Sequence, residues 1–115
     1  MHDGVDLFGA LRDTMSECKH ETEKLMHDGI TVAECKRNYR QALAKRQLEL
    51  REVDKLPATL IHDVSRGDEL CSQLRCELDC AEAIYGATYQ RIQILKREAD
   101  IIREQINREL SRGGQ

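Results

Sequence analysis

The sequence lacks most of the residues that fill a compact mixed core. It has no tryptophan and one phenylalanine, and aromatic residues make up 3% of its 115 positions. A core must therefore be built from Leu, Ile, Val, Ala, Met and Cys, in a chain of the length of one domain. It also has only one proline and seven glycines, so the positions at which helices end are easy to place.

Long apolar runs and a signal segment are absent as well. No stretch approaches the ~20 apolar residues of a membrane-spanning helix. The start of the chain, Met1-His2-Asp3, lacks the basic and then apolar order of a secretory signal. Five cysteines in a chain of this kind indicate reduced thiols. We therefore expect a cytoplasmic protein.

Charge is plentiful, but it is not of one sign. Charged residues make up 34% of the chain with both signs interleaved, and the net formal charge is −3. A composition rich in Ala, Glu, Lys, Leu and Arg is typical of long helices and coiled coils. The small acidic excess argues against a protein that coats nucleic acid, because the neutralisation of phosphates needs a basic excess.

The apolar spacing predicts an all-α fold that begins with a helical hairpin. A first helix is expected over about 5–27, because apolar positions recur there at steps of three and four. These positions are Val5, Phe8, Leu11, Met15, Cys18, Thr22 and Leu25. Gly29 would close this helix. A second helix is expected over about 31–55, with Thr31 as its N-cap and Pro57 beyond its end.

A short helix over 59–65 and a long C-terminal helix over about 68–110 are expected to complete a single domain, 1–110, with 111–115 as a frayed tail. Asp68 would cap the long helix. Its apolar positions follow strict steps of four and three: Leu74, Leu78, Ala81, Tyr85, Thr88, Ile92, Leu95, Ala99, Ile102 and Ile106. This heptad repeat predicts supercoiled packing against another helix, and one glycine, Gly86, costs too little to break it.

The long helix also predicts self-association. Two helices of about 36 Å each cannot cover one of about 64 Å, so its C-terminal half would lie exposed. We therefore expect a homo-oligomeric helical bundle or coiled coil, with Ile92, Leu95, Ile102 and Ile106 at the interface. A second apolar stripe lies beside this seam: Ile84, Ala87, Ile94 and Ile101. The alternative is a monomer whose long helix folds back at a break near Gly86.

No pattern of an active site or metal site is present in the sequence. Nucleophile-elbow, phosphate-loop and dinucleotide-binding patterns are missing. Cys71, Cys76 and Cys80 lack the tight pairing of zinc ligands, and small buried apolar residues explain them better. The four histidines are scattered. The sequence thus predicts a protein that is not an enzyme and has no cofactor.

Directional hydrogen-bonding residues gather around the connector between Pro57 and Asp79. We single out five of them as ligand-binding candidates: Thr59, Asp63, Arg66, Asp68 and Arg75. Arg66 beside the start of the long helix would help to hold an anion, unless Asp68 caps the same amides. The other interpretation is that Asp63, Arg66 and Asp68 are caps and ion pairs of a turn.

A basic run on the second predicted helix is the remaining candidate. It consists of Lys36, Arg37, Arg40, Lys45 and Arg46, with Tyr39 within it. Glutamates flank it, so it forms a patch. It is either a solvated face or a face that contacts phosphates.

Three segments resemble a family of small helical proteins. They are Tyr39-Arg40-Gln41-Ala42-Leu43-Ala44, Leu56-Pro57-Ala58-Thr59-Leu60-Ile61, and Arg66-Gly67-Asp68 with Leu74-Arg75, Asp79, Ala81-Glu82 and Tyr85. The family comprises uncharacterised early proteins of phages and prophages of Gram-positive bacteria. The resemblance extends from about Leu25 to Leu110 and implies a setting, without an established activity. The sequence departs from it in its extra cysteines and at Val53-Asp54-Lys55, where a glycine is expected.

These observations lead to three hypotheses. The first is a counter-defence protein of an infected host's cytoplasm, which sequesters a nucleotide-type immune signal or binds a host defence protein. Arg66 and Arg75 would meet phosphates, Thr59, Asp63 and Asp68 hydroxyls, and Tyr39 or Tyr85 would stack on a base. The second is an accessory of phage recombination or replication that binds DNA or a recombinase through the basic run. The third is a purely structural coiled coil.

Overall fold

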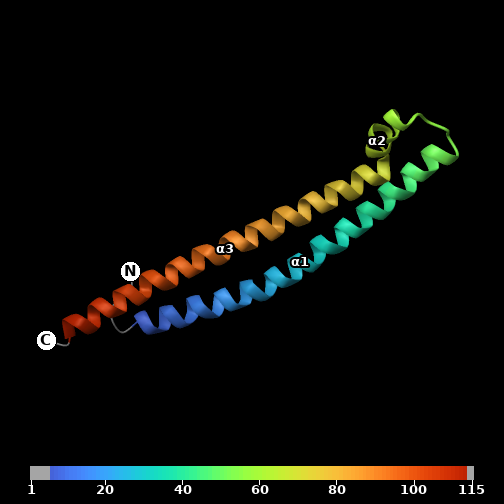
Figure 1. The fold of residues 1–115 in the computed structure, drawn as a ribbon. Helices are drawn as coiled ribbons and strands as arrows, with labels where there is room; N and C mark the ends of the chain where they lie inside the picture. The colour runs from blue at the N-terminus through green and yellow to red at the C-terminus, as the bar shows by residue number, and fades with distance from the viewer. Residues whose placement is uncertain (1–5, 114–115) are drawn as a thin grey trace. The chain divides into compact units, whose positions relative to one another are not determined.

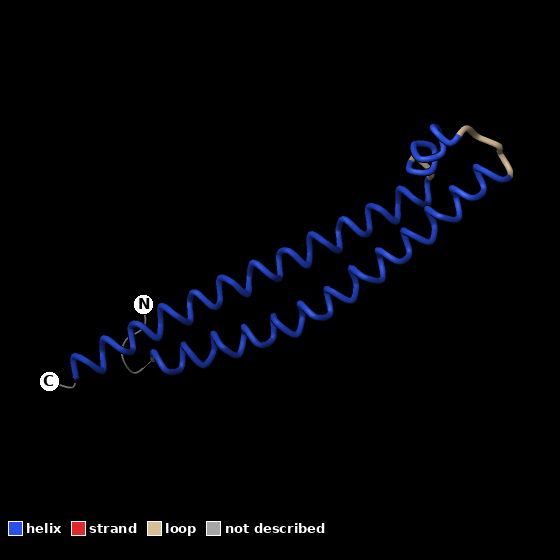
Figure 2. The backbone as a smooth tube through the Cα atoms, in the orientation of Figure 1, coloured by secondary structure: helices blue, strands red, loops and turns tan. Residues whose placement is uncertain are grey.

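The computed structural model describes residues 6–113, and these form three α-helices and no strand (Figures 1 and 2). Helix α1 spans Leu7–Glu52, α2 spans Ala58–Arg66 and α3 spans Glu69–Gly113. The all-α class, the short helix and the long C-terminal helix are confirmed. Val5, the predicted first position of the first helix, lies outside the described residues.

The predicted break at Gly29 is wrong, because α1 continues through it for 46 residues. The hydroxyl of Thr31 does not cap a new helix. It donates to the carbonyl of His27, one turn earlier, at 3.2 Å, which is a bond that Ser and Thr make inside helices. A single glycine costs only ~1 kcal/mol in a helix, and the neighbouring turns outweigh it.

The backbone at Gly29 instead packs beside an aromatic ring. A Cβ atom at this position would lie 3.4 Å from Cε2 of Tyr85, which is an ordinary contact distance, so the site would also accept a small side chain. Gly29 is therefore an interior position of α1 and not a helix end.

The end of α1 is defined by backbone hydrogen bonds. The amides of Val53 and Asp54 both donate to the carbonyl of Glu49, and the amide of Leu56 donates to that of Leu50 at 3.0 Å. Lys55 adopts a left-handed φ of 55° in this turn, a conformation that favours glycine. This is the segment in which the resembled family is expected to carry a glycine.

Helix α2 is bounded by Pro57 and Gly67. Pro57 precedes its first residue, the amide of Gly67 donates to the carbonyl of Asp63 at 3.2 Å, and the amide of Asp68 donates to that of Ser65 at 3.3 Å. Gly67 has a right-handed φ of −81°, so it ends the helix without using its left-handed freedom. Asp68 then caps α3 as predicted, because its Oδ2 accepts from the amide of Cys71 at 3.2 Å. At the far end, the predicted fraying from 111 is wrong as far as Gly113, which is still helical.

The contacts within the chain fall into two compact units. Unit 1 combines the residues up to Met26 with those from Gly86 onwards. Its α1 and α3 segments run antiparallel, since Leu7 packs with Ile102 and Ile106, and Lys24 donates to the hydroxyl of Thr88 at 3.0 Å. The prediction of a single domain is neither confirmed nor excluded by this division.

The predicted interface residues of α3 are buried inside unit 1. Ile92, Leu95, Ile102 and Ile106 retain at most 8% of their exposure. Their cover comes from α1, which is about as long as α3 because it does not break at Gly29. These four side chains are therefore not available to a second copy, and the argument that assigned them to an interface was wrong.

The inner face of α1 in unit 1 agrees with the predicted one at Leu11, Cys18 and Leu25, which are half-buried, and differs by one residue at the positions that alternate with them. Leu7 is buried, whereas Phe8 and Met15 are 56% and 49% exposed. The inner positions include polar Thr14 and Glu21, which are half-buried. Glu21 and Glu17 both pair with Arg91 of α3. Polar residues at inner positions concealed the true register from the apolar pattern.

Unit 2 spans His27–Tyr85 and contains α2. Its buried side chains include Tyr39, Leu50, Cys71, Leu78 and Ala81. Ser65 of α2 is completely buried, and its hydroxyl donates to the carbonyl of His62 at 2.9 Å while accepting from Gln47 of α1 at 3.5 Å. This satisfied polar group fixes α2 against α1 in unit 2.

Replacing Gly29 with alanine tests the continuity of α1. We expect G29A to raise the free energy of unfolding by ~0.5–1 kcal/mol, because alanine is the better helix former and its Cβ would meet Tyr85 at ordinary contact distance. Urea denaturation measures this change. G86A, with nothing within 4 Å of its added Cβ, should shift stability in the same direction. A loss of stability in G29A would instead indicate a helix end at this position.

Replacing Ile102 with alanine tests the seam of unit 1. We expect I102A to lower the free energy of unfolding by ~2–4 kcal/mol, because it leaves a cavity beside Leu7. The matched variant I30A removes an isoleucine that is 58% exposed, and its cost should stay below ~1 kcal/mol. Equal costs in urea denaturation would contradict the buried register of α3.

Candidate functional site

A small hollow in unit 2 brings together three of the residues predicted to bind a ligand. Its volume is about 220 Å³, and it is lined by Tyr39, Arg66, Ser72 and Arg75. Tyr39 comes from α1, Arg66 from the last turn of α2, and Ser72 and Arg75 from the start of α3. The turn at Gly67 thus brings two arginines and a serine to one hollow.

The two arginines of this hollow differ in their surroundings. The guanidinium of Arg75 lies 5.5 Å from the centroid of the Tyr39 ring, and its Nε is 3.2 Å from Oδ1 of Asp79. Both partners of this ion pair are more than half exposed, so it is weak and easily exchanged for another anion. Arg66 makes no ion pair with any residue in the range 6–113.

Tyr39 has a different part from the one predicted. It is 9% exposed, and Arg75 covers its ring, so the ring is not open for a base to stack on it. Its place beneath Arg75 restrains the guanidinium through a cation–π contact. Ser72 was missed by sequence reasoning, although it lies three residues before Arg75 and therefore on the same face of α3.

The other predicted ligand-binding residues do not join the hollow. Thr59 and Asp63 are exposed on α2 and do not line it. Tyr85 packs against Gly29 and lines a separate hollow with Val32 and Glu82. Seven residues were predicted to bind a ligand. Three of them, Tyr39, Arg66 and Arg75, line this hollow, and the other four lie elsewhere in unit 2.

Asp68 is fully engaged within the fold. Its Oδ2 caps α3, and its Oδ1 lies 3.3 Å from Nε of Arg46, which also pairs with Glu49 at 3.2 Å. The Arg46–Asp68 contact is an ion pair without hydrogen-bond alignment, since Nε of Arg46 has no hydrogen-bond partner. The carboxylate occupies the start of α3, so this helix end is not open to an anionic ligand.

Cys71 lies directly beneath this cap. It is 1% exposed, and burial raises the pKa of its thiol, with a further contribution from its hydrogen bond to Asp68. It is therefore a protonated packing residue at neutral pH. The interpretation of this cysteine as a small buried apolar residue is confirmed.

The basic run of α1 covers about half of the helix circumference. At about 100° per residue, Lys36, Arg40 and Arg37 lie within an arc of about 100°, and Lys45 lies about 80° further around the helix. Arg46 points to the opposite side, where it is paired with Asp68 and Glu49. The other four cations therefore form a local patch on one half of α1, without the extended stripe that a continuous contact with a nucleic-acid backbone needs.

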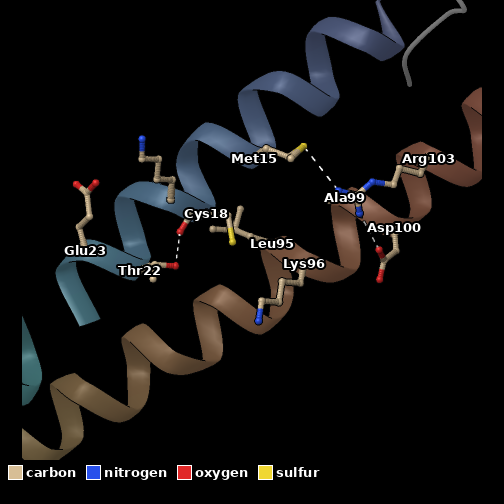
Figure 3. Close-up of a pocket in the computed structure, with 10 residues that line it drawn as sticks. Met15, Cys18, Thr22, Glu23, Leu95, Lys96, Ala99, Asp100 and Arg103 are labelled. Carbon is tan, nitrogen blue, oxygen red and sulfur yellow. Dashed lines mark hydrogen bonds and ion pairs between the residues drawn. The ribbon is translucent and has the colours of Figure 1, made fainter. Parts of the chain in front are cut away.

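The largest hollow described is a groove of about 650 Å³ in unit 1 (Figure 3). Met15, Cys18 and Leu95 point into the space between the α1 and α3 segments. Thr22 and Ala99 also line the groove, together with the charged residues Lys19, Glu23, Lys96, Asp100 and Arg103, and Arg103 pairs with Asp100 at 3.0 Å. The groove therefore has an apolar floor and charged edges of both signs.

Comparison with protein-family models, curated proteins and solved structures found no match to this chain. The resemblance to phage early proteins stays a prediction. None of the described helices has a stretch long and apolar enough to cross a membrane. Within residues 6–113, no three His, Cys, Asp or Glu side chains are grouped so that they could hold a metal ion together.

Proposed function

We propose that this protein is a non-enzymatic binding protein, whose unit 2 captures the phosphate part of a small anionic ligand in the hollow of Tyr39, Arg66, Ser72 and Arg75. The observation that carries the proposal is that two arginines and a serine from two helices line one hollow. Guanidinium groups bind phosphate oxygens through charge-assisted, often bidentate hydrogen bonds.

The size of the hollow supports a phosphate group as the part that is bound. Its volume of about 220 Å³ lies below the ~300–1,000 Å³ of sites that enclose a whole small molecule. A nucleotide would place its phosphate between Arg66 and Arg75 and leave its base outside. In the setting that the resemblance implies, such a protein would act as a counter-defence protein that sequesters a nucleotide immune signal of the host.

Calorimetric titration with pyrophosphate, a cyclic dinucleotide and ADP-ribose tests this proposal. We expect binding of at least one of them, weakened at least about tenfold in R66A and in R75A, because each variant removes charge-assisted hydrogen bonds. The matched control R97A removes an exposed arginine of α3 that lies outside the hollow. Absence of binding of all three, or equal binding by R66A and the unaltered protein, would refute the proposal.

A second candidate function is that of a structural helical oligomer. Ile94 and Ile101 of α3 are 54% and 50% exposed and lie two turns apart on one face. We propose that a second copy covers this pair.

Sedimentation equilibrium of a double variant tests self-association. We expect the unaltered protein to form dimers or larger assemblies, and I94S/I101S to weaken association by about tenfold or more, because two half-exposed isoleucines lose their apolar contact. M26S is the control, since Met26 is 70% exposed on α1 and away from this pair. A monomer at micromolar concentration would exclude this second function and leave the anion site untouched.

A further inference from the structure

Two thiols lie exposed side by side on α3 in unit 2. Cys76 and Cys80 are both free and exposed, although cysteine is among the residues most often buried. They are four residues apart and therefore neighbours on one helical face. Their side chains therefore extend from the same side of α3, one turn apart. Neither residue takes part in the seam, the hollow or the groove described above.

The helix prevents this pair from closing as a disulfide. Residues at this spacing hold their Cβ atoms ~5–6 Å apart, whereas a disulfide needs ~3.5–4.5 Å. Closure would require α3 to unwind locally. An ion placed between the two sulfur atoms needs no such movement, because two metal–sulfur bonds span a longer distance than one sulfur–sulfur bond. The intact helix thus favours a shared ion over a sulfur–sulfur bond.

The number of donor groups selects the kind of ion. No third His, Cys, Asp or Glu side chain within the described residues joins the pair in a possible metal group. Structural zinc requires four ligands, and this pair supplies only two. Soft thiolates favour Cu(I), an ion that two thiolates satisfy in a linear arrangement. We propose that Cys76 and Cys80 form a two-thiolate site for a soft monovalent cation of the Cu(I) class.

Binding is an exchange of protons for the ion. Two S–H bonds break, two Cu–S bonds form, two protons leave to solvent, and the oxidation state of copper does not change. The neighbouring Cys80 raises the pKa of the Cys76 thiol, with smaller contributions from Asp79 and Glu77. Because two protons are displaced for each ion bound, the apparent affinity must rise with pH, by up to about a hundredfold per unit.

Anaerobic titration with Cu(I), in competition with a chromophoric Cu(I) chelator, tests the site. One tightly bound ion per chain is expected, with an affinity at least a hundredfold lower in C76S and in C80S. The control variant C18S/C35S removes two half-buried cysteines and should bind like the unaltered protein. Circular dichroism checks that each variant stays helical.

Three results would overturn the proposal: tight binding that survives in either C76S or C80S, a ratio of one ion per two chains, or an affinity that does not rise with pH. The inference does not depend on the anion site or on self-association. R66A, R75A and I94S/I101S should therefore bind Cu(I) as tightly as the unaltered protein.

Discussion

The packing of α3 against α1 is the constraint on which the described fold depends. A helix as polar as either of these gains little from its own propensity and is stabilised mainly by the apolar face that it buries. In unit 1 this burial centres on Leu7, Ile102 and Ile106, and in unit 2 on Leu50, Cys71 and Leu78. The uninterrupted length of α1 is what makes the burial possible in both units. A break at Gly29 would leave half of the α3 seam without cover.

The buried apolar residues of α3 are covered by α1 within the same chain. Binding functions are therefore expected on the exposed surfaces. The hollow of Arg66 and Arg75, the pair Ile94 and Ile101, and the thiols of Cys76 and Cys80 all lie away from the buried positions of α3. Each can be altered at little cost to packing, because exposed substitutions away from special features change stability little. The three proposals are for this reason experimentally separable from one another and from folding.

Sequence reasoning was most reliable where the physical signal was local. The heptad steps of α3, the cap at Asp68 and the helix after Pro57 each depend on neighbours within one or two turns, and each was predicted correctly. It was wrong at Gly29 because a glycine that ends a helix and one inside a continuous helix look alike in a sequence. The residue that packs beside Gly29, Tyr85, is far away along the chain.

In the candidate site, too, sequence reasoning identified what depends on neighbouring residues and missed what depends on contacts between distant segments. Arg66 and Arg75 were identified from the polar density around the connector, and the turn at Gly67 brings them to one hollow. The role of Tyr39 was misjudged because the cation–π contact with Arg75 joins α1 to α3. The engagement of Asp68 by Arg46 is likewise a contact between distant segments. Which side chains are already occupied is a property of tertiary packing, and composition does not reveal it.

Lys55 links the α1 terminus to the interior of unit 2. Its left-handed backbone costs ~1–2 kcal/mol for a residue with a Cβ, a noticeable share of the 5–15 kcal/mol that hold a typical domain folded. The turn is retained because the next residue, Leu56, donates to the carbonyl of Leu50, whose side chain is 1% exposed. The strained backbone at Lys55 is thus held in place by the buried Leu50. Loosening of Leu50 would release both together, so the start of α2 and the end of α1 should open as one cooperative segment.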